Sequence, residues 1–215
     1  MASFINAAAL DEATTSPNYL YILFETTALT LRHLKGTPAF DIVENLLIPS
    51  LGIIVERNIS DMMSYAFQIF ALFVANSQQL TQLYRDLMQS ILNNKSNWGK
   101  EMRFLVPSIA NYVIAVIYKY PGEFINDANN LKTLQEIVSH LMQPDVRMET
   151  TGMQIASGIF EKLAAGAPLN DSFVHGFLLS VFSSLHFYRN NTKAKVIPIT
   201  ISKAIWSCVA TFIIY

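Results

Sequence analysis

Residues 16–38, "SPNYLYILFETTALTLRHLKGTP", form one predicted helix that is apolar on two sides. The first stripe keeps the i, i+3, i+4, i+7 spacing of a helix face, and it comprises Leu20, Leu23, Phe24, Thr27, Ala28, Leu31 and Leu34. Ile22 and Leu29, seven residues apart, form a second stripe beside Glu25 and Arg32. A helix on the surface of a single globular domain needs only one apolar stripe. This helix is therefore predicted to be covered on two flanks.

Residues with strong positional preferences mark both ends of this helix. Ser16 suits the N-cap and Pro17 the first turn, where the missing amide hydrogen costs nothing. Gly36 followed by Pro38 suits the end of the helix and the turn after it.

The same helical periodicity recurs along the chain, and no segment alternates as a strand between hairpin turns does. The further predicted helices are residues 38–57, 59–77, 78–94, 98–120, 131–143, 146–165, 170–190 and 193–215. We expect a bend in the second helix at Pro49, an N-cap at Ser60, and an interruption of the 98–120 helix at Pro107.

The spacing of these helices predicts a repeat architecture. First helices of successive pairs begin near residues 17, 59, 98, 145 and 193, at intervals of 42, 39, 47 and 48 residues. HEAT and armadillo units have roughly 40–47 residues. We therefore predict an all-α, HEAT/armadillo-like superhelix, an open solenoid of antiparallel helix pairs. Its approximate repeats are 17–57, 59–94, 98–143, 145–190 and an incomplete 193–215.

A solenoid also explains the two apolar flanks, because each pair packs on the pair before it and the pair after it. A closed helical bundle is the alternative. The final residues, "WSCVATFIIY", are strongly apolar, whereas a natural solenoid ends in a repeat with a polar outer face. We therefore expect residues 1–215 to be a single fragment of a longer solenoid.

The composition raises a membrane alternative, since 52% of residues are hydrophobic and 14% are charged. A bilayer span needs about 20 mainly apolar residues. Residues 62–84 contain the polar run "NSQQLTQ", and the uncharged residues 172–188 contain two His and four Ser. We interpret the composition as helices buried on two sides, and we expect no membrane insertion.

The net charge of -1 gives no general attraction to nucleic acid, and we expect no nucleic-acid partner. One local bias exists, because no acidic residue follows Asp171 while Arg189, Lys193, Lys195 and Lys203 remain. We interpret these charges as solvated, and contact with an acidic partner is the alternative.

No pattern indicates catalysis, a metal site or a cofactor. The four histidines are His33, His140, His175 and His186, and none has metal-ligand spacing. His175 and His186 share a predicted helix face near Asp171, but three such residues make a poor ligand set. Cys208 is the single cysteine and is predicted to be a buried thiol. Gly152 and Gly158 are predicted to let helices approach closely. We expect that the protein is not an enzyme.

One pair of helices carries a more specific pattern. The first, "PNYLYILFETTALTLRHL", contains an Asn-Tyr followed by Phe-Glu-Thr and Leu, at Asn18, Tyr19, Phe24, Glu25, Thr26 and Leu29. The second, "ISDMMSYAFQIFALFVAN", contains Tyr65, Phe67, Gln68, Ile69, Ala71, Leu72 and Phe73. This succession resembles the C-terminal region of the CAS family of nuclear exportins. "LYRDLMQSILNNKSNW" is similar to the helix and loop that follow there. The chain departs from the family pattern where Met63 and Ser64 replace Ile-Pro.

The resemblance implies a HEAT-repeat receptor that carries importin-alpha out of the nucleus together with Ran-GTP and releases it after GTP hydrolysis. It also implies shuttling between nucleus and cytoplasm, with nucleoporins as further partners. Ran would be held mainly by N-terminal repeats absent from this chain, and these residues would form the C-terminal arch that embraces cargo. Another HEAT-repeat interaction scaffold, without a transport role, is the alternative.

The resemblance does not identify the residues that contact a partner. Glu44, Arg85, Asp86 and Lys132 are candidates by expected exposure alone, and solvated helix charges are the other interpretation.

Overall fold

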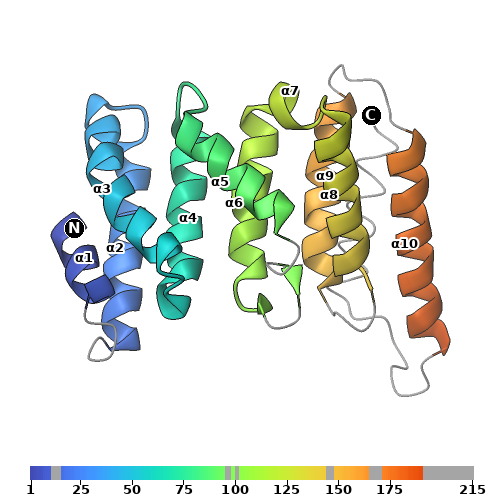
Figure 1. Ribbon diagram of the computed structural model, residues 1–215, viewed down its shortest axis with the longest axis horizontal. Coiled ribbons are helices and arrows are strands. Elements are labelled where there is room, and N and C mark those ends of the chain that lie inside the picture. Colours follow the sequence, from blue (N-terminus) through green and yellow to red (C-terminus); the bar gives the residue numbers. More distant parts are fainter. Residues whose placement is uncertain (11–15, 95–97, 100–101, 144–147, 165–170, 191–215) are drawn as a thin grey trace. The chain divides into compact units, whose positions relative to one another are not determined.

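The computed structural model describes residues 1–10, 16–94, 98–99, 102–143, 148–164 and 171–190 (Figure 1). The regular elements in these ranges are all helices, which confirms the predicted all-α class. The chain divides into two compact units, Met1–Leu80 and Thr81–Tyr215, and each unit is considered by itself.

The first unit contains α1 (Ala2–Leu10), α2 (Pro17–Leu34), α3 (Pro38–Glu56) and α4 (Ser60–Asn76). Residues 35–37 and 57–59 are the only links between α2, α3 and α4, and such short turns place consecutive helices antiparallel. α4 packs against α3 and also against α2. The α2–α4 contact includes the rings of Phe24 and Tyr65, which stack with centroids 4.9 Å apart.

The ends of α2 confirm the sequence interpretation. The Ser16 hydroxyl accepts a hydrogen bond from the Tyr19 amide at 3.2 Å, and Pro17 occupies the first turn. Gly36 has φ of +75°, a left-handed conformation that residues with a Cβ adopt at a cost.

Two features of this unit differ from the prediction. Ile22 and Leu29, predicted to be covered, are 62% and 49% exposed, because the helices that contact α2 lie on its other faces. Helix α1 was not predicted, since its short apolar run has no acidic residue in its first turn and no basic residue in its last turn. It packs mainly on α3, where Ile5 is fully buried.

The second unit contains α5 (Gln82–Asn93), α6 (Val106–Lys119), the single turn α7 (Pro121–Phe124), α8 (Ala128–Leu141), α9 (Glu149–Ala164) and α10 (Asp171–Asn190). In the predicted repeats, α6 and α9 are first helices, whereas α5, α8 and α10 are second helices. α6 packs against α9, and α8 packs against both α5 and α10. First helices thus stack on first helices and second helices on second helices, which is HEAT-like packing.

Buried aromatic side chains connect α5 to α6 and to Trp98. The Tyr112 hydroxyl of α6 donates to the Tyr84 carbonyl of α5 at 2.8 Å, and both side chains are fully buried. Burial raises the pKa of Tyr112 because the charged phenolate would lose its hydration. The Trp98 indole N–H donates to the Ile91 carbonyl at 3.3 Å, which anchors the segment before α6 on α5.

Both glycines predicted to allow close helix approach do so. A Cβ on Gly152 of α9 would lie 3.2 Å from Leu141 Cβ and 3.3 Å from the Val138 carbonyl oxygen of α8. A Cβ on Gly158 would lie 3.0 Å from the ring of Tyr118 in α6. α9 therefore approaches α8 at one glycine and α6 at the other.

Several predicted helix boundaries were wrong. Ser60 is the first residue of α4 rather than its cap, since Ile59 holds the N-cap position without a side-chain bond. Pro107 does not interrupt a helix starting at Trp98 but lies in the first turn of α6, where it needs no amide hydrogen. α5 begins at Gln82 rather than at Gln78.

The 131–143 helix also begins earlier than predicted. α8 starts at Ala128, because the Asp127 carboxylate caps it by accepting from the Asn130 amide at 2.8 Å. α3 continues through Pro49, at which a bend was predicted. The predicted 193–215 helix, with Cys208, Lys193, Lys195 and Lys203, lies outside the described residues, as does the side chain of Arg189.

The glycine contacts give a stability prediction. Gly152→Ala should lower the free energy of unfolding by about 1–3 kcal/mol, because the backbone oxygen of Val138 cannot move aside for a methyl group. Gly52→Ala is the matched control, since a Cβ there meets nothing within 4 Å. That change should stabilise α3 by up to about 1 kcal/mol through helix propensity. Urea denaturation followed by far-ultraviolet circular dichroism measures both, and equal effects would contradict the packing described.

Candidate interaction surface

The four candidate contact residues lie on different helices. Glu44 is a half-buried residue of α3, in the first unit. Arg85 and Asp86 are adjacent on α5 and Lys132 is exposed on α8, so these three lie on second helices that pack together. The structure thus places three of the four in one unit, on neighbouring helices.

Two of these candidates are engaged within the chain. Arg85 forms a bidentate ion pair with Glu123 of α7, with Nε–Oε2 and Nη2–Oε1 distances of 2.7 and 2.9 Å. The Asp86 carboxylate accepts a hydrogen bond from the side-chain amide of Gln82 at 2.7 Å, and Gln82 lies one turn earlier on α5. A partner that uses Arg85 would have to displace Glu123.

The ion pair shifts the pKa values of both Glu123 and Arg85. Hydrogen bonds from Arg85 hold the pKa of the Glu123 carboxyl below its ordinary value, and the bond to Glu123 raises the pKa of Arg85. Both side chains are 40% exposed, so the pair is screened by solvent and adds little stability. A carboxyl with a lowered pKa stabilises the fold above its ordinary pKa, and this contribution is lost as the pH falls through the lowered value.

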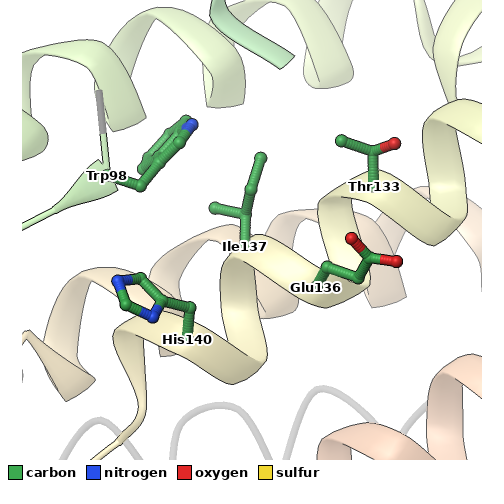
Figure 2. Close-up of a pocket in the computed structure, with 5 residues that line it drawn as sticks. All are labelled: Trp98, Thr133, Glu136, Ile137 and His140. Atoms are coloured by element: carbon green, nitrogen blue, oxygen red, sulfur yellow. The ribbon is translucent and has the colours of Figure 1, made fainter. Parts of the chain in front are cut away.

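A cavity of about 310 Å³ lies between α8 and the segment before α6 (Figure 2). Thr133, Glu136, Ile137 and His140 line it with i, i+3, i+4, i+7 spacing, so they share one face of α8. Trp98 faces them from the other side. Trp98 and Ile137 are buried and form the apolar part, whereas Glu136 is exposed at the opening.

The cavity suits an apolar side chain better than it suits catalysis. The Thr133 hydroxyl donates to the Asn129 carbonyl at 3.0 Å and is therefore bonded to its own helix rather than to His140. A nucleophile needs a base within hydrogen-bond reach, and the lining residues that the structure describes do not show this arrangement. Sequence reasoning missed the cavity because Trp98 and α8 are about one repeat apart along the chain.

The histidines do not gather into a site. His175 and His186 are both exposed on α10, and a ring nitrogen of His186 lies 2.7 Å from the Asn190 side-chain nitrogen. In the part of the chain that the structure describes, no group of three or more His, Cys, Asp or Glu residues could hold a metal ion.

Among the described helices, α3 alone is long and apolar enough to cross a membrane by length and composition. A core helix of a soluble protein passes the same test. α3 contacts α1, α2 and α4, and Phe40, Leu47, Leu51 and Ile54 are buried in these contacts. We therefore interpret these four residues as packing residues, whereas Ile42 and Leu46 of the same helix are 62% and 61% exposed.

Comparison with known families identifies the chain. Residues 5–199 match the family described as CAS/CSE protein, C-terminus. The chain belongs to this family. No curated protein and no solved structure matched it. The CAS/CSE family is one of exportin-type transport receptors rather than of enzymes. The match covers both units, and it extends well beyond the two helices whose motifs carried the resemblance.

The Arg85–Glu123 pair gives a pH prediction. Arg85→Met should raise the pKa of Glu123 toward its ordinary value, because the carboxylate loses its two charged hydrogen bonds. Lys132→Met, at an exposed position of α8, is the control and should leave the Glu123 pKa unchanged. Nuclear magnetic resonance titration of the carboxyl carbons measures both. A Glu123 pKa that ignores the loss of Arg85 would contradict the ion pair.

Proposed function

We propose that this chain is the C-terminal part of a nuclear transport receptor that exports importin-alpha from the nucleus in complex with Ran-GTP. The observation that carries the proposal is the family match over residues 5–199. The stacking of first helices on first helices and second helices on second helices supports it, because nuclear transport receptors are built from such pairs.

The proposed role of these residues is to embrace the cargo. Each helix pair contacts only its neighbours, so a stack of pairs offers an extended surface and bends by many small shifts. Cargo release then requires a change of curvature spread over several interfaces rather than the opening of one site. Second helices such as α5 and α8 carry the charged candidates Arg85, Asp86 and Lys132.

The proposal includes the route of the receptor. It moves between nucleus and cytoplasm, contacts nucleoporins on the way, and releases importin-alpha in the cytoplasm after GTP hydrolysis on Ran. In this proposal, Ran is held mainly by N-terminal repeats of the receptor. No chemistry by this chain is needed, since the nucleotide on Ran is the switch.

A pull-down with the complete receptor tests the proposal. Immobilised receptor should retain importin-alpha when Ran-GTP is present and lose it when Ran-GTP is omitted or replaced by Ran-GDP. Retention that ignores the nucleotide would favour a HEAT-repeat scaffold without a transport role. Absence of importin-alpha under every condition would reject this cargo.

The 215-residue chain gives a second, separable test. Alone, it should bind Ran-GTP weakly or undetectably in a surface-based binding assay, because it lacks the repeats proposed to hold Ran. The complete receptor serves as the positive control on the same surface. Nanomolar capture of Ran-GTP by this chain would show that the Ran site has been assigned to the wrong repeats.

A further inference from the structure

The cavity between α8 and Trp98 is apolar inside, because the polar atoms of its inner wall already have partners. The Trp98 indole N–H donates to the Ile91 carbonyl of α5 at 3.3 Å, and the Thr133 hydroxyl donates to the Asn129 carbonyl of α8 at 3.0 Å. Trp98 and Ile137 are only 1% and 5% exposed. A ligand in this space is therefore held by the burial of apolar surface, and it gains no hydrogen bond from the Trp98 or Thr133 donors.

The size of the cavity fits two fused rings. Its volume is about 310 Å³, whereas an apolar cavity of about 150 Å³ holds one benzene molecule. The lining residues of α8 run from Thr133 to His140, which is about 10 Å along the helix axis at 1.5 Å per residue. A single phenyl ring would leave about half of the volume empty, and empty volume forfeits packing contacts.

The opening of the cavity offers a hydrogen-bond acceptor. Figure 2 shows the Ile137 side chain pointing toward Trp98, whereas Glu136 projects from α8 beside Thr133. Glu136 is exposed, and a carboxylate has several acceptor sites. It can therefore accept from a further donor beside the interaction that it already has within the chain. The opening thus favours a ligand that is not anionic and that carries a hydrogen-bond donor at one edge.

We propose that this cavity binds a tryptophan side chain of a partner protein. Among the amino-acid side chains, tryptophan alone has two fused rings, and its indole N–H is a donor with no acceptor. The rings lie between Trp98 and Ile137, and the N–H donates to the Glu136 carboxylate at the opening. Aromatic pairs are stabilised beyond their buried area, and tryptophan side chains in such pockets carry much of the binding energy of protein interfaces.

The partner approaches the row of second helices, since α8 packs on α5 and α10. It is defined by its tryptophan alone, so this site stands or falls independently of the proposed transport function. A free small molecule with an indole ring and a second copy of this chain are the other occupants, and the experiment below separates them.

Nuclear magnetic resonance of the Trp98 indole N–H tests the proposal. The chain has two tryptophans, so Trp206→Phe leaves Trp98 as the source of a single indole signal. The probe is N-acetyltryptophanamide, whose side chain lies between two amide groups as it does in a protein. It should shift the Trp98 signal in a saturable way. Its analogue methylated at the indole nitrogen should bind about tenfold more weakly, because it loses one charge-assisted hydrogen bond. N-acetylphenylalaninamide should also bind about tenfold more weakly, because one ring fills only part of the cavity.

Three variants assign the binding to the cavity. Thr133→Phe places a ring in the space and should abolish the shift. Glu136→Ala should remove the difference in affinity between the probe and its methylated analogue, an effect that a purely structural role of Glu136 would not produce. Lys132→Met is the control, since Lys132 is exposed on the same helix and is not among the described lining residues, and it should change neither affinity. Circular dichroism of each variant confirms that it is folded.

Four results would overturn the proposal. The probe and its methylated analogue could bind equally well when Glu136 is present, or Thr133→Phe could bind the probe as tightly as the unsubstituted cavity does. Free tryptophan could bind more tightly than N-acetyltryptophanamide, which would assign the cavity to the free amino acid. A Trp98 signal that shifts with protein concentration before any probe is added would assign the cavity to a second copy.

Discussion

The arrangement of the helices in the second unit depends on the close packing of α9 against both α6 and α8. Gly158 brings α9 against the Tyr118 ring, and Gly152 brings it against Leu141 and the Val138 carbonyl. On α9, Phe160 then meets Phe177 of α10 edge to face, with ring centroids 5.0 Å apart. The two glycine contacts join neighbouring helix pairs, and the contact between Phe160 and Phe177 joins the two helices of one pair. Stability in such a stack is a sum of pair and interface terms, so no single central core holds the unit together.

The sequence predicted best those features that local geometry determines. Ser16, Pro17 and Gly36 have strong positional preferences, and the structure places the ends of α2 where these residues predicted them. Helical periodicity gave the number and order of most helices for the same reason. It failed for α1, and it placed a helix start at Trp98, whereas α6 begins at Val106 with Pro107 in its first turn.

Contacts between segments distant in the chain were not predictable from the sequence. Arg85 was a candidate by its expected exposure, but its partner Glu123 is 38 residues away on a single helical turn that was not predicted. The cavity beside Trp98 depends likewise on the position of α8. A charged residue on a helix looks the same in sequence whether it meets solvent, an internal partner or a cargo. For this reason the family match, and not any residue pattern, supports the function.

The two rows of the second unit are joined by different kinds of contact. Between the first helices α6 and α9, the Gly158 contact is reinforced because the Tyr118 hydroxyl donates to Glu161 and the Lys162 ammonium lies 4.8 Å from the Tyr118 ring centre. Between the second helices α8 and α10, the hydroxyl oxygens of Ser180 and Ser139 lie 3.2 Å apart, and the group nearest to a Cβ added at Gly176 would be the side chain of Gln135. Hydroxyl and amide groups can replace a lost hydrogen bond by one to water at little net cost. An aromatic ring packed against a glycine has no such replacement for the contact. In the contacts described, the row of first helices is therefore joined through an aromatic ring on a glycine, and the row of second helices through polar side chains.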